Sequence, residues 1–181
     1  DYDNILNIAG DGVMGAVEIP SIDVYLPIYH GTDSKSLEKG AGHLENSSFP
    51  VGGKGTHSII SAHTGLPSAK MFDNLTEVKE GDIFYIHVLN RTLAYEVNQI
   101  KVVLPENISD LLINKNRDYV TLITCTPYGI NSHRLLVRGE RIPYREAKKK
   151  DKSESKSNNM WKAYALVGVL AVVLIILLWY Y

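Results

Sequence analysis

The sequence contains a single cysteine, Cys125, among its 181 residues. One thiol cannot form a disulfide within the chain, so cysteine does not cross-link this fold. Cys125 is therefore either a small buried side chain or a reactive thiol with partners elsewhere in the sequence.

Several common ligand-binding patterns are also missing. We find no internal repeat, and the glycine-rich stretch GGKG at 52–55 lacks the Lys-Ser/Thr ending of a phosphate-binding loop. The acidic residues are scattered and match no EF-hand spacing. No papain-like motif surrounds the cysteine. We therefore expect no metal site and no cofactor.

The chain lacks an excess of either charge sign, since 19 Lys and Arg nearly balance 20 Asp and Glu and the formal net charge is −1. This balance hides a split, because residues 145–162 carry seven Lys and Arg against three Asp and Glu. The rest of the chain therefore has a formal charge of −5. A mildly acidic globular part argues against nucleic acid as a partner.

One long hydrophobic run is present, at residues 163–181, and it contains no charged residue. Nineteen helical residues span roughly 28 Å, close to the thickness of the hydrocarbon core of a bilayer. Trp161 and the aromatic residues 179–181 fall near its two ends, where interfacial aromatic residues gather. The run predicts a transmembrane helix over 163–181, and the polar, basic stretch 145–162 predicts a linker before it.

The remainder of the chain is rich in alternating, β-branched segments separated by turn residues, which predicts seven or eight strands. Helical segments are few and short, with expected ranges of 34–39, 68–75 and 109–114. Many strands with few helices favour a mostly β fold, a closed barrel or a sandwich, because closure removes exposed strand edges. The predicted strands are 15–19, 23–29, 57–62, 82–89, 93–104, 119–126 and 134–142.

Cys125 ends the apolar run YVTLIT and precedes Thr126-Pro127. Proline has no backbone N–H, so the strand should stop there. A strand end is a place where a rigid scaffold presents a side chain at the surface. A thiol needs a base or a positive neighbour to become a nucleophilic thiolate.

Arg134 opens the next predicted strand after a loop, and chain reversal would bring it beside Cys125. A guanidinium there could stabilise a developing oxyanion. Considered by itself, the simpler interpretation is a surface arginine that pairs with a carboxylate. His133 would face the opposite side of the sheet from Arg134. We therefore favour Arg134 as the site residue.

The base should be one of six histidines. His63 follows an apolar strand, as Cys125 does, so the two could meet at one end of a barrel. His43 in GAGHLE is the competitor, whereas His30 and His87 lie in or at the end of predicted strands and could be structural.

The segments TLITCTP, NSHRLLVRG, SAHTGLPSAKMF, GAGHLE and YLPIYHGT together resemble the sortases, specifically the class C, pilus-building sortases of Gram-positive bacteria. The resemblance covers about residues 13–144. It implies an eight-stranded β-barrel in which Cys125 is the nucleophile, His63 the general acid and base, and Arg134 the substrate and oxyanion binder.

The resemblance also implies the reaction. The enzyme would cleave an LPXTG-like sorting signal of a pilin between Thr and Gly through a cysteine thioester, and a lysine amine of another pilin would resolve that thioester. Two alternatives stay open: a sortase that attaches proteins to peptidoglycan with a lipid II amine as acceptor, and a non-catalytic, membrane-tethered assembly module in which Cys125 is inert.

The predicted organisation has four parts. Residues 1–12 are an N-terminal segment, interpreted as the remnant of a truncated lid or anchor region, 13–144 the catalytic barrel, 145–162 the linker and 163–181 the membrane helix. Class C sortases usually carry an Asp-Pro-aromatic lid motif, which residues 1–20 do not contain. The resemblance places the catalytic domain outside the cell membrane, although the basic linker alone would favour the opposite orientation.

Overall fold

The computed structural model describes residues 1–67 and 69–151. Residues Asp1–Tyr144 form one compact unit. It contains eight strands, β1 (Val13–Ile19), β2 (Val24–His30), β3 (Ala41–His43), β4 (Thr56–Ser61), β5 (Ile83–Val88), β6 (Arg91–Val103), β7 (Asp118–Thr126) and β8 (His133–Ile142).

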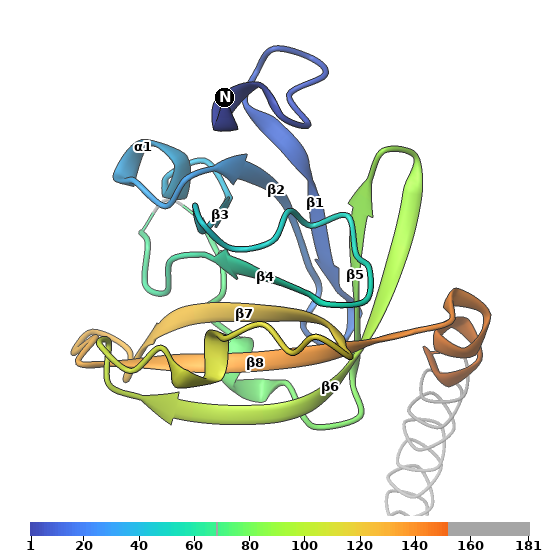
Figure 1. Cartoon of the computed structure of the whole chain (residues 1–181). Coiled ribbons are helices and arrows are strands. Elements are labelled where there is room, and N and C mark those ends of the chain that lie inside the picture. Colours follow the sequence, from blue (N-terminus) through green and yellow to red (C-terminus); the bar gives the residue numbers. More distant parts are fainter. Residues whose placement is uncertain (68, 152–181) are drawn as a thin grey trace, which may run out of the picture. The chain divides into compact units, whose positions relative to one another are not determined.

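The strands close into a barrel in the order β1-β2-β3-β4-β7-β8-β6-β5 (Figure 1). Two of its pairs are parallel, β2 with β3 and β4 with β7, and the other pairs are antiparallel. The predicted mostly β, closed eight-stranded barrel is confirmed. Closure pairs every strand on both sides, so the barrel leaves no free edge.

The side chains of every second residue along each strand point into the barrel and fill its interior, because successive residues of a strand face opposite sides. Val17, Ile28 and Ile60 are fully buried members of this core, as are Leu122 and Val137. The intervening residues of β4, β7 and β8 point out of the barrel, and these outward residues include Cys125 and Arg134.

The sequence prediction missed β3, which has only three residues and contains Gly42. Its backbone pairs in parallel with β2 and antiparallel with β4. A Cβ on Gly42 would lie 2.2 Å from the carbonyl oxygen of Gly31, so only glycine allows this close approach.

Within residues 1–67 and 69–143, helical structure is limited to short pieces. The helices are α1 (Ser34–Leu37) and the 3₁₀ turns η1 (Tyr2–Asn4), η2 (Pro20–Ile22), η3 (Leu75–Glu77) and η4 (Ser109–Leu111). The predicted helix over 68–75 is wrong, because residues 69–74 are not helical. The amide of Phe72 donates instead to the carbonyl oxygen of His63 at 2.9 Å, so this segment folds back onto the end of β4.

The N-terminal segment, residues 1–12, is held against β2 and β3. The hydroxyl of Tyr2 accepts a hydrogen bond from the amide of Gly31 at 2.9 Å and lies 2.9 Å from Nδ1 of His43. The His30 ring bonds the carbonyl oxygens of Gly12 and Ile5 at 2.9 and 2.7 Å.

Residues 144–151 are helical. The predicted transmembrane helix over 163–181 and most of the predicted linker lie outside the described residues. Among the described residues, no helix has the length and hydropathy needed to cross a bilayer.

Candidate active site

Cys125 and Arg134 are directly opposite each other on neighbouring strands. The antiparallel register of β7 and β8 pairs Cys125 with Arg134 and Thr126 with His133. Opposed residues of such a pair project to the same face of a sheet. The proline after Thr126 ends β7, and the turn at 127–132 brings the chain back into β8.

His63 reaches the same place from β4. The parallel register pairs Ser61 with Ile123, and the amide of Ala62 donates to the carbonyl oxygen of Ile123 at 3.1 Å. The hydroxyl of Thr124 donates to the carbonyl oxygen of Ala62 at 2.8 Å. The next residue after Ala62 is His63, just beyond the end of β4, and the next after Thr124 is Cys125, so these bonds bring the two chain segments close together.

The outward residues of β4 and β7 form a surface that we call the outer face. It includes His57, Ile59 and Ser61 of β4, and His63 follows two residues beyond the end of this strand. Its burial changes along the strands: His57 and Ile59 are only 1% and 2% exposed, whereas Ser61 and His63 are partly exposed. β7 shows the same trend, from buried Thr121 to partly exposed Ile123 and Cys125. The outer face is therefore covered at one end and open at the end that carries Cys125.

The His63 ring differs from the other histidine rings of the described residues in its hydrogen bonding. Among residues 1–67 and 69–151, neither the His63 ring nor the Cys125 thiol makes a hydrogen bond to another side chain or to the backbone. The other five histidine rings are all bonded, those of His30, His43, His57, His87 and His133. A base must be able to reach a substrate proton, and a ring without a fixed partner meets that requirement.

The backbone around His63 is nevertheless firmly held. Ala62 is bonded to β7, and the carbonyl oxygen of His63 accepts from the amide of the fully buried Phe72. A fixed backbone with an unbonded ring is a suitable arrangement for a group that must meet a substrate in a defined position.

Arg134 is oriented by the backbone. Its Nη1 donates to the carbonyl oxygens of Asn131 and His133 at 3.1 and 3.0 Å. The ion pairs of the described part of the chain do not include it. The remaining N–H groups of its guanidinium can therefore address an anionic or carbonyl oxygen near Cys125.

His43, the competing candidate for the base, is fully buried in β3. Its Nε2 lies 2.9 Å from the carbonyl oxygen of Ser48, and its Nδ1 lies 2.9 Å from the Tyr2 hydroxyl. Burial lowers the pKa of this imidazole below its ordinary value. The geometry makes His43 a structural residue that ties the N-terminal segment to the barrel. His133 bonds Ser132 Oγ at 2.9 Å.

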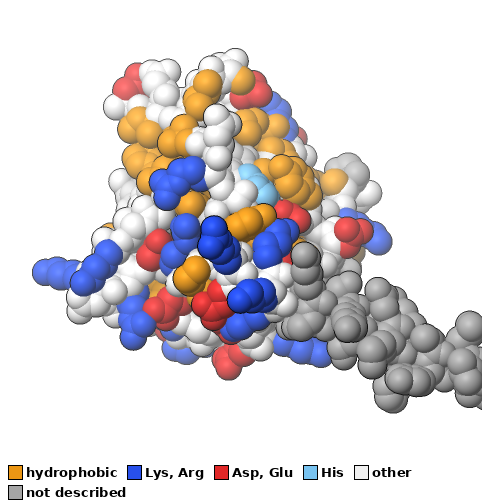
Figure 2. Space-filling model, turned by 90° about the vertical axis from the view of Figure 1, so that its right-hand side faces the viewer, with side chains coloured by type: hydrophobic (Ala, Val, Ile, Leu, Met, Phe, Trp, Pro, Cys, Tyr) orange, Lys and Arg blue, Asp and Glu red, His pale blue; other side chains and the backbone are white. Residues whose placement is uncertain are grey.

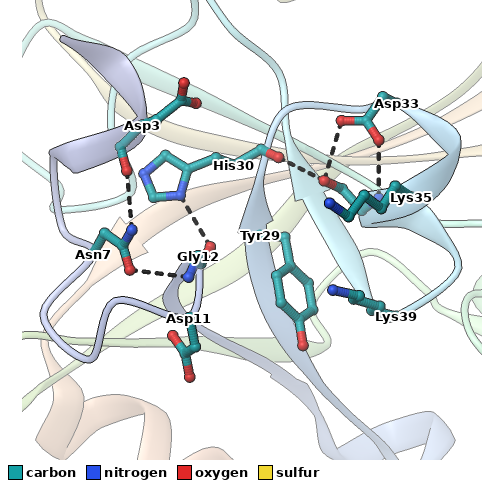
Figure 3. Close-up of a pocket in the computed structure, with 10 residues that line it drawn as sticks. Asp3, Asn7, Asp11, Gly12, Tyr29, His30, Asp33, Lys35 and Lys39 are labelled. Carbon is teal, nitrogen blue, oxygen red and sulfur yellow. Dashed lines mark hydrogen bonds between the residues drawn. The ribbon is translucent and has the colours of Figure 1, made fainter.

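Two of the hollows in the described residues border the N-terminal segment and the β5–β6 turn, away from Cys125. One, of about 270 Å³, lies between residues 3–12, β2 and α1, and its lining includes His30, Asp33 and Lys39 (Figure 3). The other, of about 650 Å³, is an open depression beside the β5–β6 turn, lined in part by Tyr25 and His87. Figure 2 shows the face on that side, where Lys and Arg are interspersed with Asp and Glu below a more apolar upper part.

No three of the His, Cys, Asp and Glu side chains within 1–67 and 69–151 converge on a possible metal position.

Comparison with known proteins identifies the family. Residues 17–142 match the sortase domain family model. The chain belongs to the sortase family. Among solved structures, sortase C-1 from Actinomyces oris is 58% identical, with a TM-score of 0.76, over 78% of this chain and 77% of that one. The pilus-related sortase C of Group B Streptococcus is 52% identical, with a TM-score of 0.73, over 75% of this chain and 70% of that one. The resemblance to class C sortases is thereby confirmed.

Curated relatives of this sortase are more distant. Sortase D of Bacillus subtilis is 29% identical over 131 residues, which make up 71% of this chain and 63% of that protein. Sortase A of Bacillus anthracis is 28% identical over 130 residues, 72% of this chain and 60% of that protein. The chain thus spans about three-fifths of the length of these curated relatives.

The sequence reasoning did not single out His57. Its place in the alternation of the predicted strand 57–62 puts it on the outer face and could have drawn attention to it. Its partners could not have been found in this way, because one of them, Leu112, is 55 positions further along the chain.

Proposed function

We propose that this sortase is a class C cysteine transpeptidase that polymerises pilins. The observation that carries the proposal is the register of the strand ends: Cys125 and Arg134 are opposed on β7 and β8, and β4, which pairs with β7 up to Ser61 and Ile123, ends two residues before His63. Three chemically complementary groups on one exposed surface match the requirements of acyl transfer.

In the proposed first half-reaction, the Cys125 thiolate attacks the Thr carbonyl carbon of an LPXTG-like signal. Arg134 stabilises the oxygen as it becomes negative. When the Thr–Gly bond breaks, His63 donates a proton to the departing glycine amine, and Cys125 retains the acyl group as a thioester.

In the second half-reaction, a lysine amine of another pilin attacks the thioester. His63 accepts a proton from that amine, an isopeptide bond forms, and the Cys125 thiolate leaves. A thioester conserves the activation of the acyl group, so an amine can replace water as the acceptor.

The sequence pattern supports the cellular setting, which is part of the same proposal. We infer that residues 163–181 anchor the enzyme in the cell membrane, that residues 145–162 link the anchor to the barrel, and that the barrel acts outside the cell on pilins that carry LPXTG-like signals. A titration of the chain into liposomes, followed by flotation, tests the anchor, because a chain that stayed in the aqueous fraction would contradict it.

The central experiment is to incubate the purified chain with pilin carrying an LPXTG-type signal and to measure its intact mass. We expect an acyl adduct on Cys125, followed by covalent pilin–pilin products. A chain that formed no adduct with several sorting peptides, and whose Cys125 resisted alkylation in the folded state, would instead be a non-catalytic assembly module. An adduct resolved by a lipid II amine but not by pilin lysine would favour anchoring to peptidoglycan.

A further inference from the structure

His57 lies on β4, at the covered end of the outer face and six residues before His63. Its Nε2 is 2.7 Å from the hydroxyl oxygen of Thr121, and its Nδ1 is 3.1 Å from the carbonyl oxygen of Leu112. A carbonyl oxygen can only accept, so Nδ1 carries the proton and Nε2 accepts from Thr121. One neutral tautomer thus satisfies both bonds.

The partner Leu112 belongs to the loop between β6 and β7, residues 104–117. Figure 1 shows this loop, in yellow, crossing in front of β7 and β8. None of its residues is buried, and the apolar side chains of Leu104, Ile108, Leu112 and Ile113 are 50–66% exposed. The loop is therefore not held in place by packing of its own side chains.

Polar contacts hold the loop instead. Near its middle, the Asp110 carboxylate accepts from Gln99 Nε2 at 3.1 Å and from Lys101 Nζ at 2.6 Å, both on β6. Two residues further, the Leu112 carbonyl bonds His57 on β4. The first contact is at the surface, where an ion pair contributes little, whereas the His57 ring is 1% exposed. At the end of the loop, the Arg117 guanidinium bonds Glu140 on β8, and the Arg117 carbonyl oxygen accepts from the amide of Gly55 at 2.7 Å. Among these contacts, the one with His57 involves a buried ring.

The loop also lies within reach of a substrate bound at Cys125. An extended peptide rises about 3.3 Å per residue, so four residues span about 13 Å, the same length as the four residues of β7 from Cys125 back to Thr121. Thr121 is the residue that bonds His57. A peptide that lies along the outer face with its reacting carbonyl at Cys125 therefore ends beside Leu112.

We propose that His57 is a positioning residue, which holds Leu112 and its loop against the outer face and thereby sets the affinity for the peptide bound beside Cys125. It acts through the loop and does not touch the reacting atoms. The inference rests on the proposed function for its kinetic part, whereas the hold on the loop stands on the structure alone.

The test uses two variants of the full chain. His57→Phe keeps a buried aromatic ring and removes both hydrogen bonds. Thr121→Val removes only the hydroxyl that bonds His57, and Thr121→Ser restores that hydroxyl. His87→Phe is the matched control, because that ring bonds Glu18 and Thr92 on other strands. Amide hydrogen exchange over residues 104–117 reports the loop, and acyl-enzyme formation with a sorting peptide gives kcat and KM.

For His57→Phe we expect the exchange rate of the loop amides to rise about 10-fold, because both hydrogen bonds of the ring are lost. KM should rise by a similar factor, whereas kcat should stay within about 2-fold of the wild-type value. Thr121→Val should change both in the same direction by less, Thr121→Ser should restore them, and His87→Phe should leave the loop unchanged.

Unchanged loop exchange in a folded His57→Phe chain would overturn the proposal, and so would a fall in kcat at constant KM. If His57→Phe does not fold, Thr121→Val serves as the test. Unchanged amide exchange of the loop in the Thr121→Val chain would then overturn the proposal. Because exchange needs no turnover, a wild-type chain that forms no acyl-enzyme would refute the proposed function while the loop measurement still tests the hold.

Discussion

His57 lies on β4 and His63 lies two residues beyond the end of that strand, and their surroundings are opposite. The His57 ring is buried and bonded at both nitrogens, whereas the His63 ring is partly exposed and makes no hydrogen bond with the described residues. The loop at 104–117 covers one end of the outer face, and the other end remains open. The same type of side chain is thus fixed by hydrogen bonds at one end of this segment and has no such bond to the described residues at the other.

The strongest test of the open end is its nucleophile. Cys125→Ala should abolish the acyl-enzyme while leaving the barrel folded, since the side chain is small and makes no hydrogen bond within the described residues. Intact mass after incubation with a sorting peptide measures the first effect, and circular dichroism measures the second. Residual adduct in this variant would place the nucleophile elsewhere.

His63→Ala should lower kcat/KM on the order of 10²-fold or more, because the leaving amine loses its proton donor. Its free energy of unfolding should change by less than about 0.5 kcal/mol, as for other substitutions at exposed sites. Enzyme kinetics and urea denaturation measure the two quantities. His133→Ala is the matched control and should keep near-normal turnover, so equal losses in both variants would contradict the assignment.

Arg134→Ala should also lose on the order of 10²-fold in kcat/KM, because the developing oxyanion loses its partner. Arg134→Lys keeps the charge but not the planar fork that bonds Asn131 and His133, so it should recover only part of this loss. Steady-state kinetics on the pair measures the effect, and full recovery by lysine would show that charge alone is required.

The covered end should give the reverse result in stability. His57→Ala removes a buried ring and leaves the Thr121 hydroxyl and the Leu112 carbonyl without their partner, so we expect a loss of about 3 kcal/mol in the free energy of unfolding. Urea denaturation of this variant beside His63→Ala makes the comparison directly. Equal stability of the two variants would mean that the difference in burial has no energetic consequence.

The smallest expected effect is on the pH dependence of stability. Burial lowers the pKa of His57 and of His43 below the ordinary value of 6.5. The unfolded chain then binds more protons than the folded chain as the pH falls below 6.5, so the free energy of unfolding decreases in that range and levels off above it. Urea midpoints between pH 5 and 8 should show this slope, and His57→Phe should flatten it. A slope unaltered by that substitution would exclude His57 as its source.

Much of this arrangement could be predicted from the sequence. Alternating residues gave seven of the eight strands, and the proline after Thr126 located the end of β7. The short turn between TLITC and RLLVRG placed Cys125 and Arg134 together, since a tight reversal leaves few registers. These features depend on neighbours along the chain, which local patterns describe well.

The missed features depend on distant neighbours. β3 is too short to show alternation and is a strand because β2 and β4 lie on its two sides. Residues 69–74 have helical spacing, but the Phe72 amide bonds the His63 carbonyl instead. The surroundings of His57 follow from a loop that begins almost fifty residues later. No local pattern contains that information.

The parallel pairing of β4 with β7 has a consequence for folding kinetics. It joins residues such as Thr56 and Asp118, which are 62 positions apart, and such high contact order slows folding because a long loop must close before the contacts form. Before β4 pairs with β7, Cys125 and His63 lie far apart in the unfolded chain. The segments that carry Cys125 and His63 therefore come together only when β4 pairs with β7 and the barrel closes, late in folding.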